Sequence, residues 1–302
     1  MYCMRAAWLA ALGFAVFAAS DAAVKLLSEA LPVVQIAFMV TGFALLAVVG
    51  ATLALSHADR LRPRQPGLAF GRGLLLAVDT LLIYYAFANL DLAEAYVLAF
   101  LTPALVAILA VAFLHERLSA SGWLGVGLGF AGVILALRPG VQALGLGHMA
   151  ALASALVFAV TILLLRRIRV AETDAAPVAV LLVMLNLLAL ALTLAGGGFA
   201  PVDLRQVLLA ALAGLLMALG HWLLIRAGRA GAAAMVAPFQ YTQIIWAGFW
   251  GLVLFGTPVS VPVAAGAAVI ILSGWLVLRP GAVVHAPRAA ARPVPPPPRS
   301  VP

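Results

Sequence analysis

Two acidic residues and one lysine lie inside long apolar segments of this sequence, where charged side chains are costly. Asp21 and Lys25 lie four residues apart in the segment 6–27, so on a helix they share a face and can form an ion pair. Asp79 lies near the middle of the segment 68–88. A charge near the centre of a bilayer costs about 2.5–3.5 kcal/mol on insertion scales. We therefore expect Asp79 to exchange protons and the face with Asp21 and Lys25 to meet a cavity.

Each of these charges also has a structural interpretation. Asp21 and Lys25 could instead reach the membrane interface as a pair and fix helix packing. Asp79 could be a hydrogen-bonded acid that faces a neighbouring helix. Glu94, at the start of the segment 92–114 and followed by Tyr96, is interpreted as a solvated acid at a helix N-terminus.

The segments 206–226 and 232–255 carry polar and aromatic groups of the second half. His221 lies inside the first segment, whereas Gln240 and Gln243 share a helical face in the second, which Trp246 extends. An amide and aromatic lining suits a ligand with a flat or cationic part. The alternative is a packing histidine and a tryptophan belt with packed amides.

Prolines interrupt one apolar segment in each half of the chain. Pro103 lies within the segment 92–114 and Pro238 within the segment 232–255. A proline inside a helix frees a backbone carbonyl in the preceding turn. In a membrane such irregular backbone is tolerated where it faces protein or a water-filled cavity. The two helix breaks therefore indicate a binding site at mid-membrane depth.

Other kinds of chemistry lack the residues that they need. His115 and Glu116 would need a second histidine at position 119 for a zinc-protease motif, and that position is Ser119. The sequence has no nucleophile–base set, glycine-rich phosphate loop or metal cluster, and Cys3 is its single cysteine. We therefore predict no enzyme, no metal site and no cofactor.

The elements that carry these residues are predicted to be membrane-spanning helices. Hydrophobic residues make up 66% of the chain and charged residues only 9%, whereas a soluble domain has roughly 25% charged residues. Ten apolar segments approach the roughly 20 residues that cross a bilayer. They span 6–27, 33–55, 68–88, 92–114, 121–138, 147–165, 176–195, 206–226, 232–255 and 261–278. The predicted fold class is an all-α integral membrane protein in the lipid bilayer.

A stretch of the chain occurs twice. Residues 89–140 and 230–281 each hold two apolar runs and end in Leu-Arg-Pro-Gly, and Arg138 and Arg279 set the offset at 141 residues. Such recurrence is typical of internally duplicated transporters. We expect a first repeat over 5–140, a second over 146–281, and a disordered proline-rich cytoplasmic tail over 286–302.

The basic residues predict the orientation. With the N-terminus in the cytoplasm, 15 of the 18 basic residues fall on the cytoplasmic side, against Arg138 and Arg205 outside. The positive-inside rule therefore puts both termini in the cytoplasm. Five spans per repeat is an odd number, so the two five-helix repeats must be inverted relative to each other. Because the arginines lie between apolar runs, a nucleic-acid partner is excluded.

Small residues mark two segments as packing elements. Gly122, Gly125, Gly129 and Gly132 fall on one helical stripe, and Gly266 with Ser273 repeats part of it. Small residues at this spacing allow close helix approach. We expect packing here and no ligand chemistry.

The chain resembles the EamA family of the drug/metabolite transporter superfamily over about residues 5–281. The resemblance rests on the segment from Pro103 to Glu116, the Arg138-Pro139-Gly140 sequence, and the run GHWLLIRAGRAGAAAMVAPFQYTQIIWAGFWGLVLFGTP. Residues 237–241, together with Ser20, Asp21 and Lys25, are most similar to the bacterial subgroup that includes S-adenosylmethionine and riboflavin carriers.

This resemblance implies a carrier that works by alternating access. With the residue-based candidates, the expected cavity residues are Asp21, Lys25, Asp79, Tyr84, Tyr96, His221, Gln240, Tyr241, Gln243 and Trp246. The chain departs from the family pattern at Thr257, where an acid is common, and near Met39 and Val40, where an arginine is common. The missing arginine argues against carrying over an anionic substrate.

We therefore predict a secondary transporter in the bacterial cytoplasmic (inner) membrane. It moves a small organic metabolite with or against protons. The alternatives are an exporter of amino acids or drug-like compounds and, from another class, a non-transporting membrane scaffold or sensor. A homodimer is a candidate oligomeric state.

Overall fold

The computed structural model describes residues 2–54, 61, 63–138, 143–165, 175–230, 237–278 and 283–284. The helices are α1 (Tyr2–Ser28), α2 (Val33–Ala54), α3 (Pro66–Asn89), α4 (Leu92–Ala99), α5 (Thr102–Leu114), α6 (Ala120–Leu137), α7 (Leu146–Leu165), α8 (Ala175–Ala195), α9 (Leu204–Ala230), α11 (Thr242–Phe255) and α12 (Val261–Leu278). The other elements are a 3₁₀ helix, η2 (Ala237–Tyr241), and two strands, β1 (Arg117–Leu118) and β2 (Val283–Val284). The predicted tail over 286–302 lies outside the described residues.

The helices have the length and surface of membrane spans. Within the described ranges, nine segments are long and apolar enough to cross a bilayer, with α4 and α5 forming one of them. Large apolar side chains point outward along these helices, including Trp8, Leu46 and Trp123. An apolar surface of this extent needs a lipid environment. The prediction of an all-helical, multi-pass membrane protein is confirmed.

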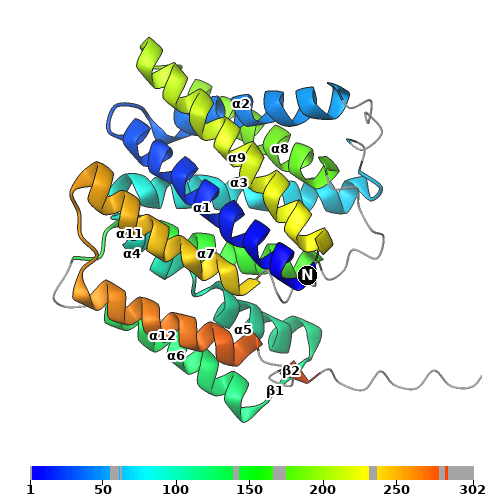
Figure 1. The fold of residues 1–302 in the computed structure, drawn as a ribbon, viewed down its shortest axis with the longest axis vertical. Coiled ribbons are helices and arrows are strands. Elements are labelled where there is room, and N and C mark those ends of the chain that lie inside the picture. The colour runs from blue at the N-terminus through cyan, green and yellow to red at the C-terminus, as the bar shows by residue number, and fades with distance from the viewer. Residues whose placement is uncertain are drawn as a thin grey trace, which may run out of the picture.

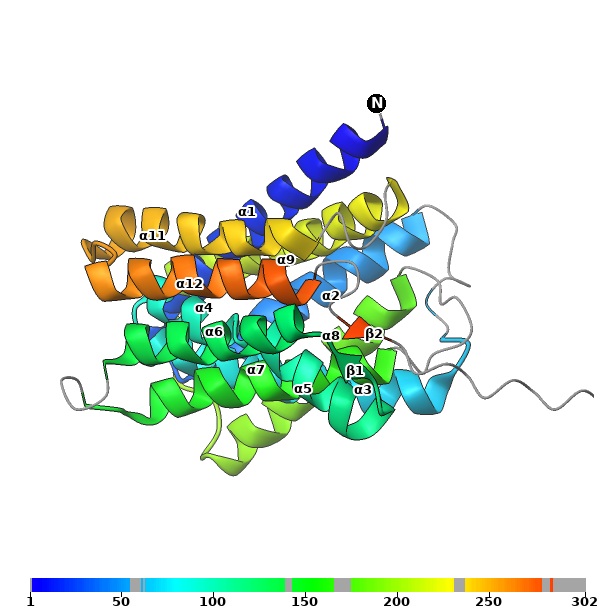
Figure 2. The same ribbon diagram turned by 90° about the horizontal axis from the view of Figure 1, so that it is seen from below.

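The helices pack mainly between the two halves of the chain (Figures 1 and 2). The main packed pairs are α1 with α9, α6 with α12, α3 with α7, and α2 with α8 and α9. In Figure 1, α6 and α12 form one edge of the bundle, and α2 lies at the opposite edge. The helices between these edges surround the candidate site.

The contact between α6 and α12 depends on small residues. Gly125, Gly129 and Gly132 are buried on the face of α6 that meets α12. A Cβ atom at Gly132 would lie 2.7 Å from Ile270 Cγ1, and Ser273 Oγ donates a hydrogen bond of 2.7 Å to the carbonyl oxygen of Gly125. The prediction that these segments are packing elements is confirmed.

Two spans are interrupted near their prolines. Helix α4 ends at Ala99, α5 begins at Thr102, and Pro103 lies in the first turn of α5. In the second half, the five residues of η2, which include Pro238, lead directly into α11. Pro103 suits the start of a helix because the first turn has no partner for its missing N–H. Ala99, Phe100 and Thr102 at the first interruption and Gln240 at the second line the candidate site.

A short strand pair was not expected from the sequence. β1 and β2 pair antiparallel, with Arg117 opposite Val284 and Leu118 opposite Val283. The pair joins the connection between α5 and α6 to the segment after α12 (Figure 1). Pairing of this kind depends on two segments far apart in the sequence, so a local pattern cannot predict it.

Candidate functional site

A cavity of about 240 Å³ lies inside the bundle. Its lining comes from α1, α3, α4, α5, α7, α8, α9, η2 and α11. Seven of the ten predicted cavity residues line it, namely Asp21, Asp79, Tyr84, Tyr96, His221, Gln240 and Gln243. The other three, Lys25, Tyr241 and Trp246, lie outside this lining.

Asp21 belongs to a hydrogen-bonded chain that joins three helices. The Tyr96 hydroxyl of α4 donates to Asp21 Oδ2 of α1, and Gln243 Nε2 of α11 lies 3.3 Å from the Tyr96 hydroxyl oxygen and donates to it. A phenol that donates one hydrogen bond can still accept another. Tyr96 therefore connects an acid of the first half to an amide of the second half.

Asp79 is held by a different helix pair. Ser154 Oγ of α7 donates to Asp79 Oδ1 of α3 at 2.6 Å. Ser154 was missed in the sequence analysis because a single serine in an apolar span is equally typical of helix packing. Only the packing of α3 against α7 brings its hydroxyl group to the acid.

His221 has a defined orientation on α9. Its Nδ1 lies 2.9 Å from the carbonyl oxygen of Met217 and donates to it, and its ring makes an edge-to-face contact with Phe17 at 4.9 Å between centroids. With Nδ1 as the donor, the neutral imidazole has Nε2 as an acceptor. His221 can therefore accept a hydrogen bond from a ligand.

The predicted ion pair between Asp21 and Lys25 is wrong. The Lys25 ammonium group donates to the carbonyl oxygens of Phe87 and Leu90, at 2.8 and 2.6 Å, and lies 5.3 Å from the centroid of the Phe255 ring. These carbonyls belong to the C-terminal end of α3, where the helix dipole also stabilises a cation. Lys25 thus joins the ends of α1, α3 and α11 instead of facing the cavity.

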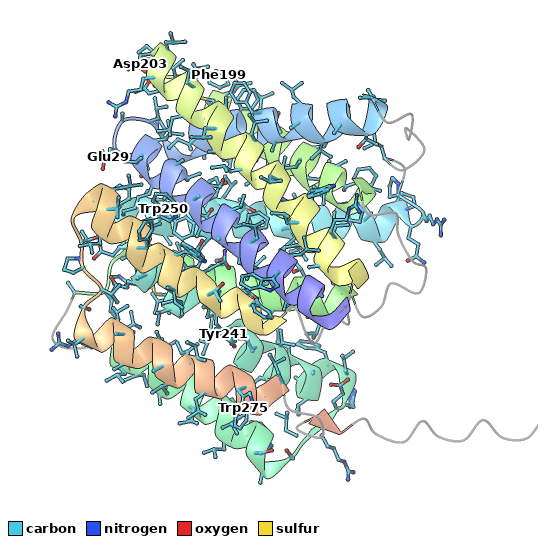
Figure 3. All side chains as sticks on the ribbon, in the orientation of Figure 1. Glu29, Phe199, Asp203, Tyr241, Trp250 and Trp275 are labelled. Carbon is cyan, nitrogen blue, oxygen red and sulfur yellow. The ribbon has the colours of Figure 1, made fainter. Side chains whose placement is uncertain are left out.

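Replacing Lys25 with methionine is expected to lower stability without removing a cavity group. The change leaves two carbonyl oxygens without their donor, and a hydrogen bond to a charged group contributes about 1.5–3 kcal/mol. The measurement is the thermal unfolding midpoint of the purified protein, with Glu29→Gln, an exposed acid near the same helix end, as the control (Figure 3). An unchanged midpoint for Lys25→Met would contradict this role.

Glu94 is not the solvated acid expected from the sequence. It is 8% exposed, and its carboxylate lies 3.3 Å from His148 Nε2 of α7. His148 Nδ1 accepts from the Gly145 backbone N–H at 3.0 Å, so the hydrogen is on Nε2 and faces the acid. The start of α4 packs against the start of α7, which buries both groups.

Tyr241 and Trp246 face away from the cavity. The Tyr241 hydroxyl group approaches Gly274, and Figure 3 shows the residue on the side of its helix that faces α12. Trp246 is 37% exposed and contacts Phe249. Gln240 and Gln243 therefore line the cavity as expected, whereas Trp246 does not.

The described residues offer no metal site, since no three His, Cys, Asp or Glu side chains among them gather closely enough to hold an ion. The cavity instead offers carboxylates, amides, hydroxyl groups and aromatic rings. Such a lining can bind and release a small polar molecule.

An apolar helical bundle with carboxylates and amides in an internal cavity is typical of multi-pass membrane transporters. Residues 4–138 match the model of the EamA-like transporter family. Over its first half, the chain is therefore similar to the EamA-like transporters of the drug/metabolite transporter superfamily.

Relatives with transporter names cover most of the chain. It is 27% identical over 250 residues to a riboflavin transporter of Rhizobium johnstonii, covering 83% of this chain and 82% of that protein. It is 25% identical to a pseudopaline exporter of Pseudomonas aeruginosa (87% and 92% covered) and 26% identical to an uncharacterized transporter of Helicobacter pylori (70% and 73% covered).

A solved structure titled "Crystal structure of protein" has the same fold. It aligns with a TM-score of 0.59 at 19% identity, over 90% of this chain and 94% of that chain. The likeness extends beyond the residues matched by the family model, through both halves of the bundle.

Proposed function

We propose that the protein is a secondary transporter that moves a small organic molecule through the central cavity by alternating access. The observation that carries this proposal is a cavity with two carboxylates, Asp21 and Asp79, built by helices from both halves of the chain. Buried acids in a bilayer are rare and are typical of transport pathways. The transporter names of the relatives agree with this function.

The proposed architecture is ten spans in two inverted five-helix repeats, over 5–140 and 146–281. The tenth span is the run from η2 through α11, Ala237–Phe255, which the 3₁₀ turn keeps from being one continuous helix. With this span, each repeat has five, and α6 packs against α12 as the last span of each.

The cavity lining supports the repeat. Four pairs of lining residues are separated by the same 141 residues as Arg138 and Arg279: Phe17 and Phe158, Thr80 and His221, Ala99 and Gln240, and Thr102 and Gln243. A cavity lined by equivalent positions lies where the repeats meet, as in transporters built from inverted repeats. The acids break this symmetry, since the equivalents of Asp21 and Asp79 are Ile162 and Gly220.

We place the protein in the bacterial cytoplasmic membrane with both termini in the cytoplasm. The excess of arginine on one set of connections supports this orientation, and the relatives named above are bacterial proteins. Asp79 is the proposed site of proton exchange, because its carboxylate lies mid-span and faces the cavity. Similarity to a pseudopaline exporter favours export as the second candidate for the direction of transport.

Counterflow in proteoliposomes tests the function. The purified protein is loaded with unlabelled S-adenosylmethionine, riboflavin, aromatic amino acids, small neutral amino acids or choline, and uptake of the labelled compound is followed with and without a pH gradient. We expect saturable exchange of at least one compound and a response to the gradient. A folded protein that exchanges none of them would contradict transport of a small metabolite and favour export of larger amphipathic molecules.

A further inference from the structure

We propose that the central cavity selects a small organic cation, with an ammonium or similar group between its two carboxylates and its aromatic wall. This inference rests on the transport function proposed above and adds a substrate class to it. It follows from the charge, the open acceptor positions, the aromatic rings and the size of the cavity.

The lining has acids but no lysine or arginine. Its titratable groups are Asp21, Asp79, Tyr84, Tyr96 and His221. Lys25, which was predicted to pair with Asp21, instead donates to the carbonyl oxygens of Phe87 and Leu90. A buried carboxylate either takes up a proton or pairs with an opposite charge, and here a cationic ligand can supply that charge.

Both acids have open acceptor positions. In the described part of the chain, Asp21 accepts one side-chain hydrogen bond from Tyr96, and Asp79 accepts one from Ser154. An ionised carboxylate has about four lone-pair positions on its two oxygens. The remaining positions can contact a ligand, and an anionic ligand would meet repulsion there.

Aromatic rings form much of the rest of the wall. The six aromatic side chains of the lining are Phe17, Tyr84, Phe87, Tyr96, Phe100 and Phe158. Phe87 and Tyr96 lie 5.2 Å apart between centroids, and Tyr96 and Phe100 lie 5.7 Å apart, so these rings are continuous. An alkylammonium group is attracted to the faces of such rings, most strongly where water is excluded.

The cavity volume sets the size of the cation. The cavity has a volume of about 240 Å³. Drug-sized ligands occupy sites of about 300–1,000 Å³. Choline and phenyltrimethylammonium are therefore suitable probes, and the larger riboflavin requires a wider cavity.

Protection of the cavity acids from dicyclohexylcarbodiimide tests the class on the unmodified protein. The full chain in nanodiscs is labelled with the reagent, and modification at Asp21 and Asp79 is quantified by mass spectrometry. The probes are choline, phenyltrimethylammonium, benzoate as an anion, and 3,3-dimethylbutan-1-ol, which has the shape of choline without its charge. We expect each cation to protect at concentrations about tenfold lower than the neutral alcohol, and benzoate not to protect.

Variants and counterflow separate the substrate class from transport itself. Asp21→Asn is expected to weaken protection of Asp79 by choline about tenfold, whereas Glu29→Gln leaves it unchanged. Equal protection by choline and the alcohol, protection by benzoate, or no protection by either cation would overturn the cation proposal. If the cation proposal fails but another compound still exchanges in counterflow, the transport function stands without a cationic substrate. If no compound exchanges, both the transport function and the cationic substrate class are contradicted.

Discussion

Replacing Asp79 with asparagine is expected to reduce counterflow by about 100-fold, equivalent to about 2.7 kcal/mol, and to remove its response to a pH gradient. Asparagine has the size of aspartate, and its side-chain oxygen can still accept the hydrogen bond from Ser154. The substitution therefore removes a charge and a protonatable group while the contact between α3 and α7 is kept.

The measurement is uptake, into proteoliposomes, of a compound that the wild-type protein exchanges, at equal and at unequal pH across the membrane. Glu29→Gln is the matched control, because it neutralises an exposed acid just after the end of α1. Wild-type exchange by a folded Asp79→Asn protein would mean that Asp79 is a structural acid. Reduced exchange that still responds to the pH gradient would assign binding, and not proton coupling, to Asp79.

Replacing Gly132 with leucine is expected to prevent stable packing of α6 against α12. A Cβ atom at this position would lie 2.7 Å from Ile270 Cγ1 and 2.9 Å from the carbonyl oxygen of Gly266, and leucine adds three further carbons. Overpacking costs about 1–3 kcal/mol and can cost more where the neighbour is backbone. We expect the unfolding midpoint to fall sharply and most of the protein to aggregate.

Gly127→Leu is the control within the same helix. Gly127 is exposed, and a Cβ atom there has no neighbour within 4 Å, so leucine would face lipid. The two variants have the same change in composition and helix propensity, and size-exclusion chromatography with thermal unfolding compares them. Similar behaviour of the two variants would show that close approach of α6 and α12 is not required.

The helices and the small-residue contact could be predicted from local patterns. An apolar segment of about 20 residues has few stable alternatives to a helix in a bilayer, because every backbone group must be hydrogen-bonded within the segment. The stripe from Gly122 to Gly132 follows helical periodicity, so its face was predictable. The β1–β2 pair was not, because it depends on which loops meet.

The residue types of the site could be predicted better than the contacts between its residues. Asp79, Gln240 and Gln243 were identified because polar groups are costly in apolar spans, and all three line the cavity. Ser154 was missed because a single hydroxyl group in an apolar span has a low free-energy cost and so does not mark a site. Trp246 was included because it extends the face of Gln243, but rotation of α11 in the bundle leaves it 37% exposed.

The sequence by itself determined a membrane protein with long apolar helices, because hydropathy and helical period are local properties. Only the tertiary structure decided which polar groups meet. It connects Asp21 to Tyr96 and not to Lys25, and it buries Glu94 beside His148. The physical reason is that a side chain on a helix can reach several partners, and the rotation and contacts of neighbouring helices select one of them.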